Sequence, residues 1–572
     1  MSLDLSTNRA AYVVLARIYV AYPAVYHAVA TETVAVGTDV YEGRVLDVNR
    51  IRESFPGVRQ TGMPLPDAVL ELANPDRRFD ASLEEHNYWA HRIAELYCWE
   101  RGTELDPASD LIFRGFVQFP DGIEMTPTSV IVRLSDFREP WNVKVPKNQL
   151  DSARYPHASS FAEGRPIPLL YGDFTTELSG LAYGVEAFCV DTGLRGGGAV
   201  DPVLKVCDPT GTAIGAIGGT ITISRGASNV TTASAIGIDL DGTGPRHDAG
   251  TLVLDRSTWS SPDGDYAYQE GDRFYVQAKG NRNGTGALIQ TPAEVMRDLL
   301  LATTSATAAD IDVASYFLAY SYFEALGPYF RVRRHLVETQ DLWDVIAQIG
   351  FEAGIDVSNR GGKVVFQVWQ PFLASAPDAP VDIDENAIVD GSFHVLVDPE
   401  SVYANRVLAK YNWSPDAEKY LLRHAAEFEG LTVDDVTQEY AFDWMYFLKS
   451  VRQRVRRLSW LSSQALRVYR FDVGFRALTC HLGERKRLTY APLGIVDRDV
   501  QIRALDKDLA RGVVRVTAWD AYLRSDIGRW SPAGTPAYRG ATEDQRKRWG
   551  FWTDASGLAD PDDPASGRSK WI

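Results

Sequence analysis

Few residues in this chain of 572 amino acids have the spacing that catalysis or metal binding requires. His86 and His91 are five residues apart, which fits neither the His-Glu-x-x-His zinc motif nor two ligands on successive helical turns. The four cysteines are too widely spaced for a zinc ribbon, a Cys-x-x-Cys redox pair or a disulfide framework: Cys98, Cys189, Cys207 and Cys480. We therefore predict buried free thiols and no metal or cofactor.

The glycine-rich and acidic stretches do not complete a binding motif either. RGGGAV (195–200) and GAIGGT (215–220) lack the residues and spacing of a phosphate-binding loop, and we interpret them as turns. DLDGTG (239–244) begins like a calcium loop but lacks the third acidic ligand and the closing glutamate. The neighbouring carboxylates stand in solvated settings and predict no glycosidase pair: Glu84, Glu85, Asp560, Asp562 and Asp563. Without a nucleophile elbow or a Cys–His motif as well, the sequence predicts a protein that is not an enzyme.

One group of basic residues is concentrated in LKSVRQRVRRLSW (448–460): Lys449, Arg452, Arg454, Arg456 and Arg457. On a helix these residues spread around most of the circumference, so they fit either contact with nucleic acid or a helix that covers acidic neighbours. The chain has 59 basic and 76 acidic residues, a formal net charge of -17. This balance argues against a broad grip on phosphate backbones, although DNA could slide past such a surface.

The length exceeds what one hydrophobic core supports, so we expect several domains, and 45% hydrophobic residues are enough to form their cores. The N-terminus lacks the basic start and cleavage site of a signal peptide, and no stretch reaches the ~20 apolar residues of a membrane span. We expect a protein that is made and kept in a cytoplasm until it is assembled.

Strand-like segments fill residues 31–137, where short apolar or alternating runs are broken by Gly, Pro, Asn and Asp. This pattern predicts a barrel or sandwich, while NYWAHRIAELYCW (87–99) fits a helix or a strand. A proline-punctuated connector follows. From residue 181 to about 280, small and β-branched residues with many glycines predict a thin β-rich insertion with little core of its own.

Two helices are predicted after the insertion. In GTGALIQTPAEVMRDLLL (284–301), Thr291 caps the helix, Pro292 takes its first position and Glu294 completes a capping box. Its apolar stripe is Val295, Met296, Leu299 and Leu300. In the second helix Thr339 is the cap and Asp341 lies in the first turn, with the end at Gly350 or Gly354. Its inward residues are Leu342, Trp343, Ile346 and Ile349, and a hairpin with a turn from Asn359 to Gly362 follows.

Strands return after a polar break at 373–380, first in RVLAKYNW (406–413). A helix is predicted from Trp444 to Ser463, and YRFDVGFRAL (469–478) and VVRVTAWDAYL (513–523) resume the β pattern. From Trp530 the chain is rich in Pro, Gly and charge, with three spaced tryptophans: Trp549, Trp552 and Trp571. Such a segment is either disordered or an arm that lies on a neighbour.

The order of several motifs resembles the tail hub proteins of tailed bacteriophages. The motifs are GRPIPLLYGDF (164–174), GALIQTPAEVMRDLL (286–300), IDVASYFLAY (311–320) and TQDLWDVIAQIGFEAGIDVSNRGGKVVFQVW (339–369). YEGRVLDVNRI (41–51), AVLELANPDRRF (68–79) and VQIRALDKDLARGVVRVTAWDAY (500–522) look like the first and last β-domains of that group. The resemblance covers residues 34–522, and the order of the motifs is its specific part.

The resemblance implies a homotrimeric hub at the tail tip or baseplate of a virion. In that family two barrel domains per chain form a pseudo-sixfold ring, which joins the tail tube or distal tail ring to a central spike or fibre. Such a hub lines the channel, meets the C-terminus of the tape-measure protein and opens for DNA ejection during host cell entry. Some relatives bind an iron–sulfur cluster through closely placed cysteines, a grouping that this chain lacks.

We therefore predict a mainly β, multidomain chain with an α+β middle domain, two tail-tube-like β-barrel domains and a β-rich insertion. The expected parts are a barrel at 1–145, connector and insertion at 146–290, the middle domain at 291–395, a second barrel at 396–528 and an arm at 529–572. Two alternatives stay open. A tail-associated cell-wall hydrolase would need a carboxylate pair or metal triad, and a host-receptor adhesin would bind through the insertion or the arm.

Overall fold

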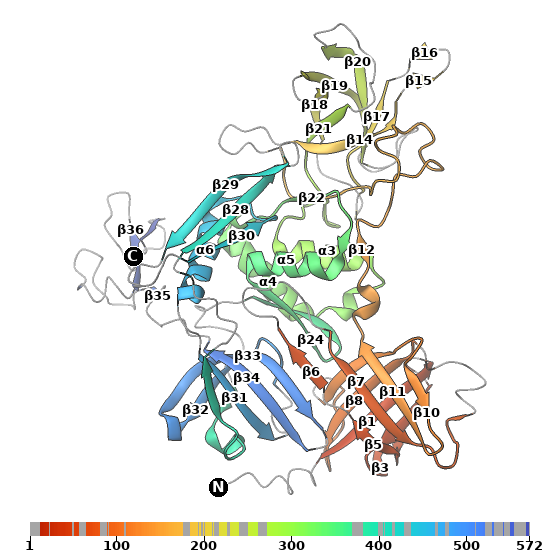
Figure 1. Ribbon diagram of the computed structural model, residues 1–572, viewed down its shortest axis with the longest axis vertical. Helices are drawn as coiled ribbons and strands as arrows, with labels where there is room; N and C mark the ends of the chain where they lie inside the picture. Colours follow the sequence, from red (N-terminus) through yellow and green to blue (C-terminus); the bar gives the residue numbers. More distant parts are fainter. Residues whose placement is uncertain are drawn as a thin grey trace. The chain divides into compact units, whose positions relative to one another are not determined.

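The computed structural model has a mainly β, multi-sheet fold, as the sequence predicts (Figure 1). By contacts the chain divides into two units, one made of 13–368 and 402–463, the other of 1–12, 369–401 and 464–572. Each unit is described by itself. The structure describes residues 12–21, 23, 25–48, 51–55, 65–80, 89, 91–107, 110–175, 184–192, 194–195, 198–199, 201–208, 210, 217–225, 229–239, 250–260, 272–368, 381–397, 404, 406–414, 418–427, 436–463, 467–474, 480–509, 511–520, 529–530, 542, 549–553 and 568–570.

The N-terminal sheet of the larger unit has ten strands, with hydrogen-bonded neighbours in the order β3-β4-β2-β1-β8-β9-β11-β7-β5 and β10 on β11. The strands are β1 (Tyr12–Ala21), β2 (Val25–Ala30), β3 (Val34–Val36), β4 (Asp39–Gly43), β5 (Val45–Val48), β7 (Asp67–Ala73), β8 (Ile93–Glu100), β9 (Leu111–Val117), β10 (Ile123–Met125) and β11 (Ser129–Asp136). A short strand, β6 (Ile51–Ser54), follows β5. The pairing in this described part does not join β3 to β5, so closure into a barrel stays a prediction.

Two of these strands lie before the predicted β region, which began at residue 31. In β1, Val13, Leu15 and Ala16 are fully buried, so the strand is a nearly continuous apolar run without the alternation that marks a half-exposed strand. The ambiguous segment 87–99 contains strand β8, in which six consecutive residues from Ala94 to Trp99 are buried.

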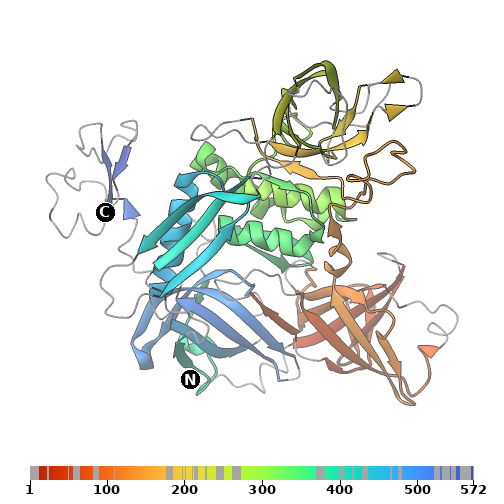
Figure 2. The same ribbon diagram turned by 45° about the horizontal axis from the view of Figure 1, so that its top comes forward.

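The insertion is a closed barrel with its own core, so the prediction of little core was wrong. Its order is β14-β17-β20-β19-β18-β21 (Figure 2), and the strands are β14 (Val185–Asp191), β17 (Val203–Lys205), β18 (Ile217–Arg225), β19 (Asn229–Asp239), β20 (Thr251–Ser260) and β21 (Arg273–Ala278). Period-two alternation sends Ile221, Ile223, Leu252 and Leu254 inward, all fully buried. Thus a few branched residues among the threonines and serines fill a narrow barrel. A side hairpin is formed by β15 (Leu194–Arg195) and β16 (Gly198–Ala199).

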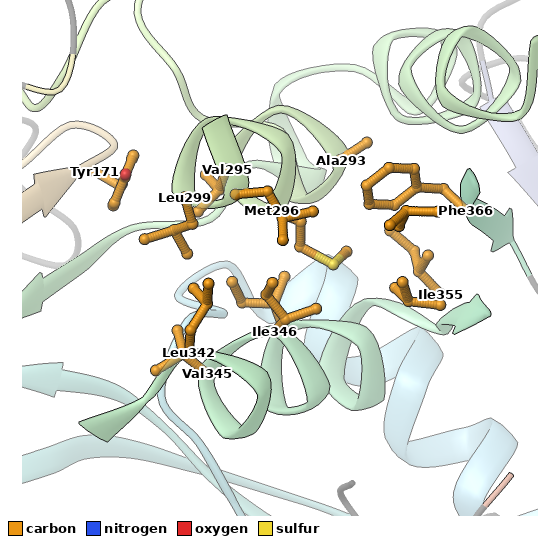
Figure 3. Close-up of a cluster of buried hydrophobic side chains, with 14 of the residues drawn as sticks. Tyr171, Ala293, Val295, Met296, Leu299, Leu342, Val345, Ile346, Ile355 and Phe366 are labelled. Carbon is orange, nitrogen blue, oxygen red and sulfur yellow. The ribbon is translucent and has the colours of Figure 1, made fainter. Parts of the chain in front are cut away.

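The connector and the middle domain form one α+β core. Its elements are η1 (Glu139–Trp141), β12 (Lys144–Val145), β13 (Leu169–Tyr171), α3 (Pro292–Thr303), η2 (Ala308–Asp310), α4 (Val313–Leu326), η3 (Pro328–Phe330), β22 (Arg334–Leu336), β23 (Gln340–Asp341), α5 (Leu342–Ala353), β24 (Ile355–Arg360) and β25 (Lys363–Val368). Figure 3 shows side chains of α3 and α5 pointing toward one another across this core: Val295, Met296 and Leu299 from α3, and Leu342, Val345 and Ile346 from α5.

The start of α3 is confirmed and the start of α5 is corrected. Thr291 Oγ1 accepts from Glu294 N at 3.3 Å, and Glu294 Oε2 accepts from Thr291 N at 3.3 Å, which is the expected capping box. Helix α5 instead follows Asp341, because residues 340–341 pair with β12 and the Asp341 carboxylate binds Lys144 Nζ at 2.8 Å. Thr339 therefore does not cap it. The helix ends at Gly354, in the left-handed region at φ 76°.

The hairpin after α5 is tighter than predicted. Strands β24 and β25 pair up to Arg360 and Lys363, so only Gly361 and Gly362 form the turn. Their φ values of 56° and 71° are those of a two-residue turn of the type that suits a right-twisted hairpin.

A third module of the larger unit combines three strands and a helix: β28 (Arg406–Ser414), β29 (Lys419–Glu427), β30 (Thr437–Phe442) and α6 (Leu448–Ser463). The sheet order is β29-β28-β30, with β30 parallel to β28. Val451, Val455 and Leu458 of α6 pack on this sheet. The helix begins four residues later than predicted, because the carbonyl oxygens of Trp444 and Met445 accept from Arg333 N at 3.0 Å and Asn412 N at 3.2 Å and are not available to a helical turn.

The smaller unit contains a sheet in the order β26-β32-β33-β34-β31-β27. Its elements are β26 (Val381–Ile383), η4 (Glu385–Ala387), β27 (His394–Val397), β31 (Arg467–Gly474), β32 (Arg485–Tyr490), η6 (Ala491–Leu493), β33 (Ile495–Asp508) and β34 (Val513–Asp520). Phe393 stacks on Tyr490 at 4.1 Å and on Phe471 at 5.5 Å between ring centroids. Near the C-terminus, β35 (Arg529–Trp530), β36 (Trp549–Thr553) and β37 (Arg568–Lys570) pair with one another.

This division differs from the predicted second domain at 396–528. The sheet takes β26 from before that range and β27 from across its first residue, whereas residues 402–463 belong to the other unit. The sequence pattern is β on both sides of this boundary, so periodicity alone does not reveal which strands share a sheet.

Candidate functional site

The structure does not bring the sequence candidates for chemistry together. Among the described residues, no three His, Cys, Asp or Glu side chains could hold a metal ion. The His91 ring lies 5.2 Å from the Phe119 ring. The other candidates lie wholly or mostly outside the described residues: His86, Glu84, Glu85, the 239–244 loop and the acidic group at 560–563. In the part described, no helix combines the length and the apolar character needed to cross a bilayer.

All four cysteines are buried and unbridged, as predicted. Burial raises the pKa of the Cys480 thiol to about 11 and that of the Cys207 thiol to about 12. A thiol in such an apolar setting stays protonated at neutral pH and is a poor nucleophile.

Buried polar side chains instead gather around Trp444, where the connector, the middle domain and the β28–α6 module meet. We call this cluster the joint, and its members are Tyr171, Asp298, Arg333, Glu352, Asn412 and Trp444. Trp444 is 2% exposed, and its ring lies 6.2 Å from that of Tyr171. The joint therefore connects segments that are more than 250 residues apart in sequence.

Asp298 of α3 joins the helix to the connector and to the base of the insertion. Its Oδ2 accepts from Tyr171 OH at 2.8 Å and from Thr210 Oγ1 at 2.5 Å. Thr210 N donates to Asn281 Oδ1 at 3.0 Å. Burial raises the pKa of Asp298, although these two hydroxyl donors act against that rise. Helix α3 is therefore held by the polar contacts of Asp298 as well as by its apolar stripe.

Gly172 explains the glycine at the end of the GRPIPLLYG motif. It adopts φ 78°, and a Cβ at this position would lie 2.4 Å from the carbonyl oxygen of Val332. Any side chain would therefore separate β13 from the strand that follows η3. This close approach lets β13 pair with β22 and brings Arg333 to the joint.

Arg333 is 3% exposed and links three parts of the unit. Its Nη1 donates to the Asp173 carbonyl oxygen at 3.1 Å, and its Nη2 donates to Asn412 Oδ1 at 2.7 Å. The guanidinium lies 4.9 Å from the Phe174 ring centroid and 4.4 Å from that of Tyr446. Because two rings and two acceptors surround it, the buried cation is well compensated.

Glu352 holds α5 to the segment before α6. Its Oε1 accepts from Asp443 N at 2.7 Å and Gln348 Nε2 at 2.7 Å, and its Oε2 accepts from Trp444 N at 2.9 Å and Met445 N at 3.0 Å. Burial, with a further contribution from the Asp443 carboxylate, raises the pKa of Glu352 to about 7 against the effect of these donors. Sequence reasoning missed this residue, although an acidic side chain at a core position of an apolar helix was a visible signal.

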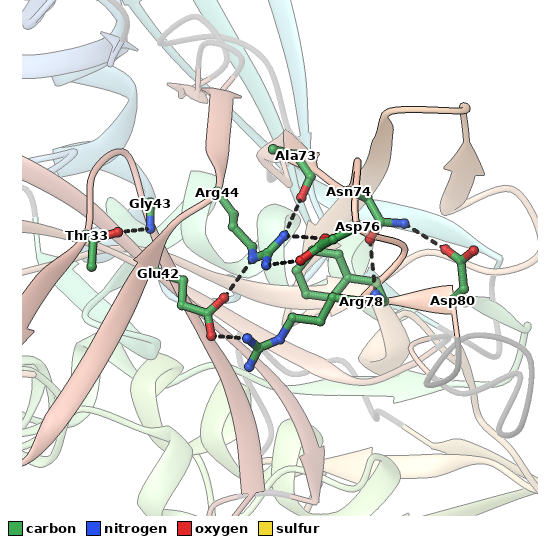
Figure 4. Close-up of polar contacts among 10 residues, drawn as sticks. Thr33, Glu42, Gly43, Arg44, Ala73, Asn74, Asp76, Arg78 and Asp80 are labelled. Carbon is green, nitrogen blue, oxygen red and sulfur yellow. Dashed lines mark hydrogen bonds and ion pairs between the residues drawn. The ribbon is translucent and has the colours of Figure 1, made fainter.

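A second polar cluster fixes the ANPDRRF loop of the N-terminal sheet (Figure 4). Arg44 donates to both oxygens of Asp76, at 2.8 and 2.6 Å, and its Nε donates to Glu42 at 2.7 Å. The Arg44 bonds lower the pKa of Asp76 to about 2. Asn74 accepts from Phe79 N at 3.1 Å and donates to Asp80 at 2.7 Å. These bonds, together with the bidentate contact between the Arg44 guanidinium and the Asp76 carboxylate, fix the conformation of the loop.

The structure separates the basic residues of α6 into two groups. Arg454 is buried 5.1 Å from the Phe351 ring centroid, and burial lowers the pKa of its guanidinium to about 10. Its Nη1 and that of Arg457 each lie 3.6 Å from where a Cβ of Gly354 would stand, at the C-terminal end of α5. Cations are favoured there because the helix dipole ends in unpaired carbonyls. The remaining three residues are exposed.

The chain is similar to solved structures of virion and tail proteins. One is a chain of the virion of a native gene transfer agent particle, 13% identical, covering 65% of this chain and 88% of that chain with a TM-score of 0.43. The tail protein from Neisseria meningitidis MC58 is 8% identical, and the match covers 89% of this chain and 96% of that chain with a TM-score of 0.38. The 43 kDa tail protein of prophage MuSo2 from Shewanella oneidensis is 9% identical, and the match covers 89% of this chain and 97% of that chain with a TM-score of 0.35.

No protein-family model matches the chain, and no curated protein matches its sequence. Similarity at these identities and TM-scores transfers no residue role to this chain.

Replacing Glu352 with Gln is expected to destabilise the larger unit by about 1–3 kcal/mol. The amide NH₂ would face backbone N–H donors, since both carboxylate oxygens accept two bonds each. Urea unfolding followed by tryptophan fluorescence measures the change. Glu338→Gln, at an exposed position, is the matched control and should leave the midpoint in place. Equal midpoints for the two variants would refute the role of Glu352.

Two buried side chains of the larger unit, His335 of β22 and Glu352 of α5, predict opposed pH dependences. Burial lowers the pKa of His335 to about 3, so its contribution to stability is complete above pH 6.5 and is lost as the pH falls toward 3. Glu352, with its raised pKa, contributes most below pH 4.5 and loses that contribution as the pH rises through about 7. Between pH 4.5 and 6.5 each group changes the unfolding free energy by at most about 1.4 kcal/mol per pH unit, and the two changes have opposite signs.

His335→Leu should therefore make the unfolding free energy rise as the pH is lowered from 7 to 5, whereas Glu352→Gln should make it fall. Urea titrations at pH 7, 6 and 5 compare both variants with the unmodified protein. His394→Leu, at an exposed histidine of β27, serves as the control. Parallel pH curves for His335→Leu and Glu352→Gln would contradict the assignment.

Proposed function

We propose that this chain is a structural protein of a bacteriophage tail: a trimeric hub at the distal end that joins the tail tube to the central spike or fibre. The observation that carries the proposal is that the sequence motifs similar to those of tail hub proteins meet at one joint. GRPIPLLYGDF supplies Tyr171 and Gly172, the capped helix supplies Asp298, and the α5 motif supplies Glu352. Motifs far apart in sequence thus serve one connecting core.

This function is consistent with the charge and the strand edges of the chain. A net charge of -17 gives a channel wall that repels DNA and lets it pass in transit. Closure of a ring by copies of the chain would cover edges that a lone sheet exposes. The proposed partners are the tail tube or distal tail ring, the tape-measure C-terminus and the spike or fibre. The hub would be assembled in the host cytoplasm and remain at the virion tail tip.

The purified protein should sediment as a trimer, or its density in virions should have threefold symmetry at the tail tip. Analytical ultracentrifugation and imaging of the intact tip are the two measurements. A stable monomer in solution, together with a single copy at the tip, would refute the hub.

A second function, recognition of a host receptor, is favoured by the way the insertion barrel is attached. Phe174 N donates to the Ala278 carbonyl oxygen at 2.9 Å, and Asp173 pairs with Lys279, so the chain enters and leaves the barrel at adjacent residues. The barrel can therefore be removed as a whole. Deletion of residues 200–263 alone would remove β17–β20 and leave β14 and β21 without those partners.

Replacing residues 176–277 by a short Gly-Ser linker, which keeps the backbone bond between Phe174 and Ala278, tests this second function. Particles that assemble normally but no longer adsorb to host cells would support an adhesive barrel, because all six residues of the joint are retained and only the Thr210 donor to Asp298 is lost. Electron microscopy measures assembly and a phage adsorption assay measures attachment. Normal adsorption of assembled particles would exclude the barrel as the receptor-binding part.

A further inference from the structure

Helix α6 exposes a stripe of basic residues that the chain does not neutralise. Lys449, Arg452 and Arg456 are exposed and fall on one face at helical spacing. Within the described residues none of them forms an ion pair, so they do not cover acidic neighbours as one interpretation of the sequence expected. Burial and the like charge of the neighbouring Arg452 lower the pKa of Arg456.

Exposed apolar side chains adjoin this stripe at the N-terminal end of α6. Tyr329 and Leu448 are 47% and 51% exposed, and Lys449 Nζ lies 4.5 Å from the Tyr329 ring centroid. The Tyr329 ring also contacts that of Phe447 at 6.0 Å. We define the α6 surface as Tyr329, Leu448, Lys449, Arg452 and Arg456. Its mixture of exposed apolar and unpaired basic groups is typical of a surface that is covered by a partner.

A complementary acidic patch lies on the N-terminal sheet of the same unit. Asp47 of β5 stands directly opposite Glu71 of β7, and Asp67 lies on the same face of β7. Like charges opposite one another across strands are destabilising, and in the described chain none of these carboxylates forms an ion pair. Leu46, beside a bulge, is 59% exposed. We define the β5–β7 patch as Leu46, Asp47, Asp67 and Glu71.

We propose that the α6 surface of one copy of the chain docks on the β5–β7 patch of the next copy. The inference rests on the proposed trimeric hub and names the surfaces that would form it. Three cations and exposed apolar side chains on one surface match three carboxylates and an exposed leucine on the other. Because the two surfaces differ, each copy uses both, and such a head-to-tail contact closes into a threefold ring when successive copies are rotated by a third of a turn. The charges fix the register of the contact.

Charge reversals in the full-length protein test this contact. One variant carries Arg452→Glu and Arg456→Glu, a second carries Asp47→Lys and Glu71→Lys, and a third combines all four. Mass photometry and sedimentation at 0.1 M and 0.5 M NaCl measure the trimer dissociation. Each double variant should weaken the trimer at least about tenfold at low salt, since each removes two attractive contacts and adds repulsion. The combined variant should recover most of that loss.

Lys147→Glu with Arg423→Glu is the matched control, because both side chains are exposed and the net charge change equals that of the first variant. The control should keep the trimer. Double variants that retain the unmodified trimer affinity would overturn the docking proposal while leaving the hub in place. A combined variant as weak as the double variants, with unchanged circular dichroism, would also overturn it. An unmodified protein that is monomeric at every concentration would instead refute the hub itself.

Discussion

The larger unit depends on the requirement that a carboxyl group removed from water finds a full set of hydrogen-bond partners. Glu352 has two acceptor oxygens and four donors, three of them backbone amides from the segment that precedes α6. Those amides would otherwise be buried donors at a chain turn without a partner. The same turn supplies the Trp444 carbonyl oxygen, which accepts from Arg333 N at 3.0 Å. The carboxylate therefore places the α6 module on the middle domain in one arrangement.

Features that depend on residues close together in the sequence were predicted well. The capping box of α3 involves residues three positions apart, and its apolar stripe is set by helical periodicity, so both were visible in the sequence. The start of α5 was not, because Asp341 is held by Lys144, 197 residues away. Likewise, α6 begins after Trp444 because the carbonyl oxygens of Trp444 and Met445 accept from Arg333 N and Asn412 N and not from the amides of a helical turn. Tertiary contacts decided both boundaries.

The mainly β class was predictable from composition and strand pattern, but the division into sheets was not. Strand β1 reads as an apolar run, since it is buried on both faces, and it was missed for that reason. The insertion looked coreless because its interior is filled by a few Ile, Leu and Val side chains among many Ser, Thr and Gly residues. The candidate site was predictable only in part: Gly172 and the capped helix belong to motifs, whereas Arg333 and Glu352 reveal their partners only in three dimensions.

The adjacent entry and exit of the insertion have a consequence for how such a chain can diversify. Gly280 N donates to the Gly172 carbonyl oxygen at 2.8 Å, next to the bond between Phe174 and Ala278, so two antiparallel backbone segments form a stem. Whatever replaces the barrel meets the same two chain ends at the same separation. An outer module can therefore be exchanged at this stem during evolution, while the middle domain keeps its geometry.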